Sequence, residues 1–254
     1  MTEQLPGGYR PWIRPGVRAF AREDAVGWLE DALTRHGTLQ AWSNGSGSVA
    51  LAGGRGVTRA RPAPRSGPAA PPWVCRHYRR GGRLAPLLDD RYLAWGIERP
   101  LRELRASAAA RARGVRTPAV VAGAAYGAGP FYRADLVTEH VTDARSLADA
   151  LHEERDGAMR RSLLRRAGSA VRDLELARLL HADASAGNIL LQPDGPAWVI
   201  DLDRCAVLPA EAPAPVGPMR ERLERSMRKL SASSGRSLND TEWAALRAGF
   251  EDGG

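Results

Sequence analysis

Apolar positions recur with helical spacing over much of the chain. In residues 22–37 they return every third or fourth position, which predicts an amphipathic helix. The same periodicity predicts a helix beyond Pro100 and dominates the second half of the chain. The segments concerned are 100–114, 146–154, 156–180, 219–230 and 241–250. The second half is therefore expected to be mainly helical.

Short apolar runs separated by glycine and proline mark the first half instead. Residues 46–60 are rich in glycine and predict a strand, a turn and a second strand. Residues 61–72 are rich in proline and alanine and predict an extended surface loop. Residues 73–78 have the length of a strand, and residues 117–141 predict two or three strands with turns at their glycines.

The order of these elements indicates the class of fold. Strands with one helix come first, and a helical half with one short strand pair follows. Segregated strands and helices are typical of an α+β fold, whereas a doubly wound sheet needs them to alternate. We therefore expect one domain built of two lobes, a β-rich lobe at about 40–140 and a mainly helical lobe at about 141–254.

Composition places the chain among ordinary globular proteins. Of its 254 residues, 43% are hydrophobic and 26% are charged. No apolar run approaches about 18 residues, and the N-terminus has no continuous apolar segment, so neither a transmembrane helix nor a signal peptide is expected. Cys75 and Cys205 stand far apart without metal-ligand spacing, which favours two free, buried thiols in a reducing cytosol.

The charge of the chain is strongly basic, with a net value of +8 and a pI near 10.4. Lys229 is the only lysine, so all but one of the 37 basic residues are arginine. Together with the many Ala, Gly and Pro residues, this indicates that part of the basicity is a compositional bias. The remainder suits a polyanionic partner, which is nucleic acid, an anionic membrane surface or a phosphorylated substrate.

The stretch "HADASAGNILL" (181–191) carries the strongest chemical signal. The apolar run 188–191, the turn "QPDG" and the apolar run 197–200 predict a hairpin that returns Asp201 to Asp183 and Asn188. His, Asp and Asn stand in the register of the protein-kinase catalytic loop H-R-D-L-x-x-x-N, which a metal-binding Asp follows. The sequence therefore predicts phosphoryl transfer from ATP.

Each of these side chains has an expected role in that chemistry. Asp183 would accept the proton of the attacking hydroxyl, while Asn188 and Asp201 would hold Mg²⁺ on the ATP phosphates. His181 is expected to support the loop rather than to act as a base.

A kinase also needs a basic side chain on a strand of the first lobe. This is usually lysine, but no lysine precedes Lys229, so Arg76 at the end of the strand 73–78 is the candidate. Glu98 and Glu103 on the following helix are candidate ion-pair partners, and Glu103 is the better centred. The glycines of "GGRG", which are Gly53, Gly54 and Gly56, form a candidate loop over the phosphates.

Several longer motifs together resemble one kinase family. They are "RHYRRGG" (76–82), "DRYLAWG" (90–96), "RADLVTE" (133–139), "HADASAGNILL", "WVIDLDR" (198–204) and "RLERSMRKL" (222–230). This set resembles the 3-deoxy-D-manno-octulosonic acid (Kdo) kinases, which are lipopolysaccharide inner-core kinases with a protein-kinase-like fold. The resemblance runs from about Gly53 to about Leu230, and "RHYRRGG" is its most specific part.

This resemblance implies a reaction and a place for it. The reaction is ATP-dependent, Mg²⁺-supported phosphorylation of the 4-hydroxyl of Kdo on Kdo-lipid A precursor. The place is the cytoplasmic face of the bacterial inner membrane, where the protein would be peripheral. The implied partners are thus that glycolipid and an anionic membrane surface, and not nucleic acid.

The resemblance also implies roles for further residues. Glu139 to Val141 would form the hinge that meets adenine, and Asp203 would support the metal site or the loop. Arg79 and Arg80, in "RHYRRGG", would bind the anionic groups of the acceptor. The catalytic loop departs from the usual family pattern "HADLNAHNIL", and the positions that differ are Ala184, Ser185 and Gly187.

Two other functions fit parts of the same pattern. One is a kinase-fold phosphotransferase for another small hydroxylated substrate, such as a heptose or an aminoglycoside. The other is a catalytically weakened or silent kinase-fold protein that acts as a basic binding module. The "RHYRRGG" motif favours the lipopolysaccharide substrate over the first. The complete set of Asp183, Asn188 and Asp201 disfavours the second.

Overall fold

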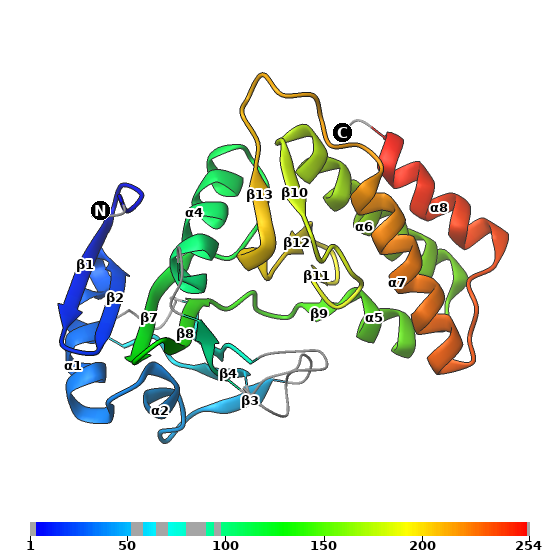
Figure 1. Ribbon diagram of the computed structural model, residues 1–254. Coiled ribbons are helices and arrows are strands. Elements are labelled where there is room, and N and C mark those ends of the chain that lie inside the picture. Colours follow the sequence, from blue (N-terminus) through cyan, green and yellow to red (C-terminus); the bar gives the residue numbers. More distant parts are fainter. Residues whose placement is uncertain (1–3, 52–57, 65–70, 80–89, 94–97, 253–254) are drawn as a thin grey trace. The chain divides into compact units, whose positions relative to one another are not determined.

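The protein has an α+β fold, with strands concentrated in its N-terminal region and helices in its C-terminal region, which confirms the predicted class (Figure 1). The structure, a computed structural model, describes residues 4–51, 58–64, 71–79, 90–93 and 98–252. The chain divides into two compact units, Met1–Arg105 with Ala119–Val141, and Ala106–Pro118 with Thr142–Gly254. The first unit includes residues before 40, which the prediction left outside its first lobe.

The first unit is built on an antiparallel sheet. Its strand order is β1-β2-β7-β8-β5-β4-β3, with β6 also paired to β8. The bounds are β1 (Tyr9–Arg14), β2 (Val17–Arg22), β3 (Val49–Leu51), β4 (Thr58–Arg61), β5 (Trp73–His77), β6 (Tyr92–Leu93), β7 (Val120–Ala128) and β8 (Phe131–Glu139). The two-residue turn between β1 and β2 contains Gly16 at φ +75, a conformation that glycine adopts without strain.

One face of this sheet packs against helices α1 (Val26–His36) and α2 (Leu39–Ser43). Trp28 of α1 meets the rings of Trp42 and Trp73 edge-on, each at 4.7 Å between centroids. Because side chains alternate along a strand, Trp73 and Cys75 of β5 face these helices while Arg76 faces the other way. The sheet therefore presents Arg76 on the face away from α1 and α2.

A buried carboxylate ties α2 to the same sheet. Asp135 of β8 is completely buried, and its Oδ2 accepts hydrogen bonds from Gln40 N and Tyr126 Oη, both at 2.9 Å. Its Oδ1 lies 2.6 Å from Nδ1 of His77, and Nε2 of that ring lies 3.2 Å from Asp90. Carboxylates thus face both ring nitrogens of His77, an arrangement that favours the imidazolium form because both nitrogens then donate.

The second unit is mainly helical. Its helices beyond residue 142 are α5 (Leu147–Glu153), α6 (Gly157–Leu176), α7 (Pro218–Ser234) and α8 (Asp240–Glu251). Side chains cap three of them: Ser146 accepts from Asp149 N, Asp156 from Met159 N, and Asn239 forms a capping box with Glu242. Helix α4 (Arg99–Ala112) begins in the first unit and ends in the second.

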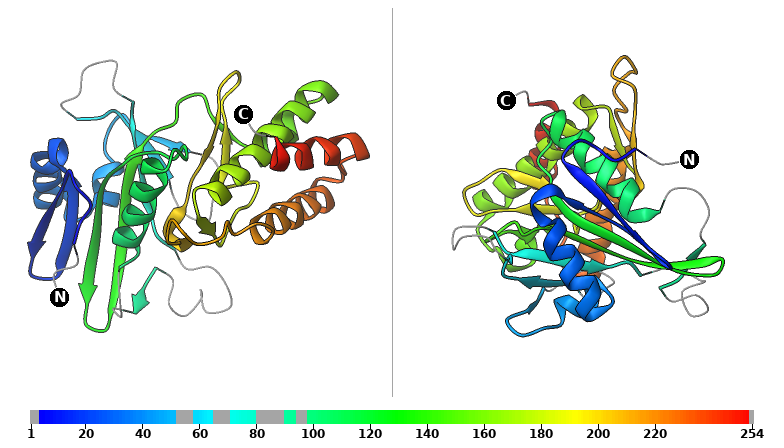
Figure 2. Two further views of the ribbon diagram at one scale, coloured as in Figure 1. Left: turned by 90° about the horizontal axis from the view of Figure 1, so that it is seen from above. Right: turned by 90° about the vertical axis from the view of Figure 1, so that its left-hand side faces the viewer.

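Glycine permits a close contact between two of these helices. Helices α6 and α8 lie side by side (Figures 1 and 2). A Cβ atom on Gly168 would overlap the carbonyl oxygen of Leu246, and one on Gly249 would overlap that of Arg165. The two backbones therefore approach more closely than any larger side chain allows.

Two small sheets complete the second unit. The first joins β9 (Arg145–Ser146), β11 (Ile189–Leu191) and β12 (Ala197–Val199), and the second joins β10 (Leu179–His181) with β13 (Cys205–Val207). The pair β11–β12 is the hairpin predicted around "QPDG". Short 3-10 helices occur at η1 (Glu23–Ala25) and η2 (Leu202–Arg204).

The structure corrects one predicted helix and adds elements that the sequence did not reveal. Residues 171–180 were expected to be helical throughout, but α6 ends at Leu176 and residues 179–181 form strand β10. Strands β1 and β2 and helix α2 were not predicted. Strand β1 is exposed over most of its length, so it lacks the apolar alternation that marks a half-buried strand.

Both cysteines are free and buried, as the sequence predicts. Along the described part of the chain, none of the helices combines the length and apolarity needed to cross a membrane.

Candidate active site

The predicted catalytic loop connects β10 to β11, in the second unit. The ladder of β10 with β13 pairs His181 with Cys205, and the hairpin of β11 with β12 pairs Ile189 with Val199. These two pairings place the end of β12 and the turn after it beside the loop. Backbone bonds confirm the approach, since Ala182 N donates to the Arg204 carbonyl at 3.2 Å.

His181 joins the two sides of this arrangement. Its Nδ1 accepts a hydrogen bond from Asp183 N at 3.1 Å, so Nε2 carries the proton and donates to the Ile200 carbonyl at 3.1 Å. Burial lowers the pKa of His181, although the Ile200 carbonyl and the nearby carboxylates favour the charged form. The buried, neutral ring thus braces the loop, which fits the supporting role predicted for it.

Asn188 lies at the centre of the site. Its Nδ2 donates to the Asp183 carbonyl at 2.8 Å, and its backbone oxygen accepts from Ile200 N at 3.0 Å. The first bond fixes the amide orientation, which leaves Oδ1 as the atom that can meet a cation. The structure therefore brings Asp183, Asn188 and the residue before Asp201 together. The Asp183 side chain itself is exposed.

Asp201 has an uncommon backbone conformation. Its φ of 64° and ψ of 55° lie in the left-handed region, which non-glycine residues rarely occupy. Asp and Asn are the side chains that tolerate this region best. Strained backbone of this kind concentrates at functional sites, which is consistent with the role predicted for Asp201. Asp203 is buried in η2, two residues further on.

Two side chains of helix α7 accept hydrogen bonds from the catalytic loop and from the end of strand β10. Ala186 N donates to Oγ of Ser226 at 3.1 Å, and His181 N donates to the sulfur of Met219 at 3.2 Å. Ala184 and Ala186 are buried, whereas a Cβ on Gly187 would meet nothing within 4 Å. Sequence reasoning missed Ser226 and Met219, because a helical pattern does not tell which loop a helix face will contact.

The first unit holds the predicted phosphate-contacting pair. Arg76 on β5 donates from Nη2 to Oε2 of Glu103 on α4 at 2.5 Å, and Glu103 is buried. The pair predicted between "RHYRRGG" and the following helix is thus formed, with Glu103 and not Glu98 as the partner. On β5, Arg76 is paired at its Cα with Thr58 of β4 and Leu136 of β8.

The other predicted residues of the first unit are placed as follows. Glu139 ends β8 and accepts a hydrogen bond from Arg22 at 2.6 Å, and Val141, two residues on, is buried. Arg79 follows β5 and is exposed. The predicted glycine loop and one predicted acceptor contact lie outside the described residues, and these are Gly53, Gly54, Gly56 and Arg80.

The donor set around the loop suits a hard divalent cation. Asn188 offers an amide oxygen and Asp201 a carboxylate, and Mg²⁺ is usually held by one or two such protein oxygens together with substrate phosphates. In the residues that the structure describes, no group of three or more His, Cys, Asp or Glu side chains is arranged as a metal site. Two protein oxygens are the number expected where substrate phosphates and water supply the other ligands.

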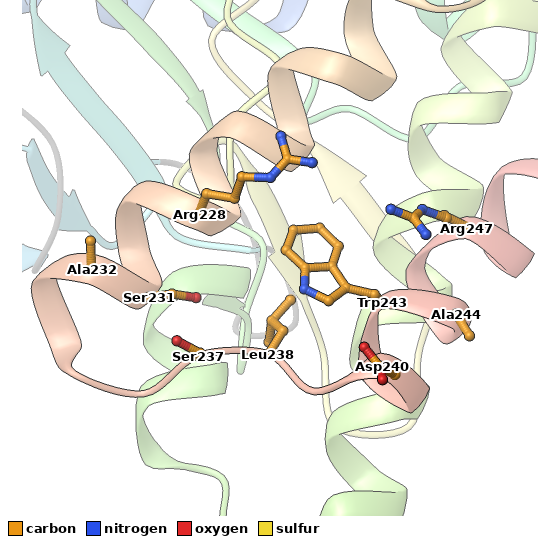
Figure 3. Close-up of a pocket in the computed structure, with 9 residues that line it drawn as sticks. All are labelled: Arg228, Ser231, Ala232, Ser237, Leu238, Asp240, Trp243, Ala244 and Arg247. Carbon is orange, nitrogen blue, oxygen red and sulfur yellow. The ribbon is translucent and has the colours of Figure 1, made fainter.

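A hollow of about 630 Å³ lies elsewhere in the second unit, between α7 and α8 (Figure 3). The indole of Trp243 lies between the guanidinium groups of Arg228 and Arg247, at 5.3 and 5.9 Å from its ring centroid. Both arginines also pair with Glu224. The predicted catalytic residues do not line this hollow, so the candidate active site remains at the β10–β11 loop.

Comparison with known proteins identifies the family of the chain. A sequence model described as the lipopolysaccharide kinase (Kdo/WaaP) family matches residues 40–250. The chain belongs to this family. The match includes the predicted site residues of the first unit and those of the second. It begins after β1, β2 and α1, which precede the matched range.

Relatives within this kinase family are similar over most of their length. The 3-deoxy-D-manno-octulosonic acid kinase of Stenotrophomonas maltophilia is 35% identical over 185 residues, which cover 70% of each chain. That of Vibrio cholerae is 31% identical over 198 residues, or 75% of this chain and 81% of the relative. That of Vibrio vulnificus is 29% identical over 214 residues, or 84% and 86%.

Proposed function

We propose that the protein is an ATP-dependent 3-deoxy-D-manno-octulosonic acid kinase that phosphorylates the 4-hydroxyl of Kdo on Kdo-lipid A precursor. The observation that carries the proposal is the hydrogen-bonded arrangement of Asp183, Asn188 and the Ile200–Asp201 turn, in a chain of the lipopolysaccharide kinase family. Relatives that carry the name 3-deoxy-D-manno-octulosonic acid kinase support the substrate class.

The side chains of the loop have distinct tasks in this reaction. Asp183, exposed at the loop surface, accepts the proton of the attacking sugar hydroxyl. Asn188 and Asp201 hold Mg²⁺, which when bound neutralises the developing charge on the ATP phosphates. His181 stays neutral and keeps the Asp183 backbone in place through its Nδ1 acceptor.

We also propose roles in ATP binding for residues of the first unit. Arg76 contacts the phosphates, because its guanidinium presents several donors to phosphate oxygens and is held by Glu103. Glu139 to Val141 meet the adenine. Arg79, exposed just after β5, meets an anionic group of the acceptor.

The basic charge of the chain suits the place where this acceptor lies. A net charge of +8 favours approach to an anionic leaflet, and a phosphorylated glycolipid adds further negative charge. We propose that the protein works as a peripheral protein at the cytoplasmic face of the bacterial inner membrane. Vesicle sedimentation at rising salt would test this point, since electrostatic attachment must weaken as salt screens it.

Transfer of labelled phosphate tests the proposed reaction directly. The purified protein is incubated with Mg²⁺, ATP and Kdo-lipid A precursor, and the phosphorylated position is found by mass spectrometry and NMR. Asp183→Ala is expected to lower the rate by orders of magnitude, because the base is lost. Asp194→Ala is the matched control, since Asp194 is an exposed carboxylate on the neighbouring β11–β12 turn and should not affect the rate.

Two results would contradict the proposal. If the wild type transfers no phosphate to Kdo-lipid A precursor but does so to a heptose-containing acceptor, the assigned substrate is wrong. If Asp183→Ala and Asp194→Ala are equally active, the assigned base is wrong.

A further inference from the structure

Tyr78 stands beside the ion pair of Arg76 and Glu103 in the first unit. It follows Arg76 by two residues, and the pairing of β5 with β8 continues as far as this residue, because Tyr78 N donates to the Ala134 carbonyl at 3.0 Å. Residues two apart on a strand share a face of the sheet, so the side chains of Arg76 and Tyr78 emerge together. Tyr78 is buried, with 3% of its surface exposed.

The hydroxyl of Tyr78 reaches the carboxylate of the pair. It donates to Oε2 of Glu103 at 2.5 Å, the same oxygen that accepts the hydrogen bond from Arg76. Glu103 is only 5% exposed, and a buried carboxylate depends on such donors because water cannot replace them. The hydroxyl therefore fixes which oxygen, and which direction, Glu103 presents to Arg76.

The ring of Tyr78 contacts Arg76, the other residue of the ion pair. The Cζ atom of Arg76 lies 4.7 Å from the ring centroid, within the range of a cation–π contact. Arginine has a long, flexible side chain, so a contact at the ring and a hydrogen bond at the fork together restrict its guanidinium. One tyrosine thus contacts both members of the ion pair, each through a different part of its side chain.

We propose that Tyr78 is a positioning residue, which sets the Arg76 guanidinium and the Glu103 carboxylate in a single arrangement for binding the phosphates of ATP. This inference rests on the proposed function, in which Arg76 contacts those phosphates. Arginine takes the place of the usual lysine here, and its larger, planar cation needs a defined orientation as well as a nearby carboxylate.

The test compares two tyrosines of the first unit, Tyr78 within a hydrophobic cluster and Tyr9 packed against the same cluster. Tyr78→Phe keeps the ring and removes the hydrogen bond to Glu103. Tyr9→Phe is the matched control, because its hydroxyl donates to the Val120 carbonyl at 2.5 Å instead. Tyr78→Phe is expected to raise the KM for ATP about tenfold, the effect of losing a hydrogen bond to a charged group. The KM for Kdo-lipid A precursor should change less than about twofold, and Tyr9→Phe should change neither constant.

A double-substitution cycle separates positioning from a general structural role. If Tyr78 acts through Glu103, Tyr78→Phe should have little added effect on the KM for ATP in a Glu103→Gln background. The inference is overturned if Tyr78→Phe leaves the KM for ATP unchanged, raises both KM values equally, or acts as strongly in the Glu103→Gln background.

Calorimetric titration with Mg²⁺ and ATP gives a readout that does not depend on turnover. Tyr78→Phe should weaken ATP binding about tenfold relative to the wild type and to Tyr9→Phe. A wild type that binds ATP but phosphorylates no Kdo acceptor would contradict the proposed function, while this comparison would still decide the role of Tyr78. A wild type that binds no ATP would overturn both.

Discussion

At the scale of single residues, the left-handed backbone of Asp201 allows its role in catalysis to be tested separately from its effect on stability. Asp201→Gly and Asp201→Ala both remove the carboxylate, so both are expected to abolish phosphate transfer. Alanine, unlike glycine, is strained in the left-handed conformation that this position adopts at φ 64°. The strain costs about 1 kcal/mol of folding free energy. Urea unfolding should therefore find Asp201→Gly more stable than Asp201→Ala by about that amount. Equal stabilities would mean that the fold does not impose this conformation.

Single residues also show which contacts the spacing of residues along the sequence can predict. Asp183 and Asn188 are five positions apart, and the hydrogen bond that joins them closes a short loop that a local pattern describes well. The contact of Ala186 with Ser226 spans 40 residues and depends on how α7 packs. No spacing along the chain encodes it, so this support could not be predicted.

At the scale of elements, the end of α6 shows why one predicted helix ran too long. Helices that end in a left-handed residue usually place glycine there, and glycine is the signal that a sequence offers. Here Arg178 takes that position at φ 55°, and the apolar residues Leu179 and Leu180 continue the helical pattern into β10. The long helices and the hairpin around "QPDG" were predictable because periodicity and turn residues agreed with the final packing.

The close contact between helices α6 and α8 predicts how an added methyl group changes the stability of the second unit. Gly249→Ala is expected to lower the free energy of unfolding by about 3 kcal/mol, because the new methyl group overlaps the backbone of α6. Gly157→Ala is the control, since its added atom meets only the guanidinium end of Arg161 on the first turn of the same helix. Chemical unfolding followed by circular dichroism measures both. A Gly249→Ala protein as stable as the control would show that the helices are not in close contact.

At the scale of the whole molecule, two buried ionisable side chains make the free energy of unfolding depend on pH, one as the pH rises and the other as it falls. The first is His77 of the first unit. Burial lowers its pKa, but hydrogen bonds and charges from Asp135 and Asp90 outweigh burial and raise that pKa above its usual value. Its stabilising contribution is therefore complete below about pH 6.5, the unfolded-state pKa, and is lost as the pH rises through the folded-state pKa.

Unfolding free energies measured from about pH 6.5 upward check the role of His77. His77→Gln, which cannot take up a proton, should show a shallower decline of stability with rising pH than the wild type. Identical slopes for the two proteins would contradict the assignment.

The second charge is Glu242 of the second unit, which is buried against Arg160 at 2.5 Å. Burial raises the pKa of Glu242, but hydrogen bonds from Arg160 and Asn239 outweigh it, so that this pKa lies below its usual value. The stabilisation is present above the unfolded-state pKa, near pH 4.5, and is lost as the pH falls through the folded-state pKa. Acid unfolding of Glu242→Gln should accordingly depend less on pH than that of the wild type. A wild-type slope in this variant would exclude the pair as the cause.

The division of the chain into units has a consequence for how such a protein can be rearranged. Each unit is assembled from two separate segments, and residues 106–118 belong to the second although they lie between parts of the first. That short segment contributes buried Ala110 and Val115 to the helical core, and its Arg116 carbonyl accepts a hydrogen bond from Val199 N. A single cut in the gene therefore cannot separate the two units with both intact, because any cut that keeps one unit whole removes a segment from the other. Division after Val141, for example, would leave the second unit without residues 106–118.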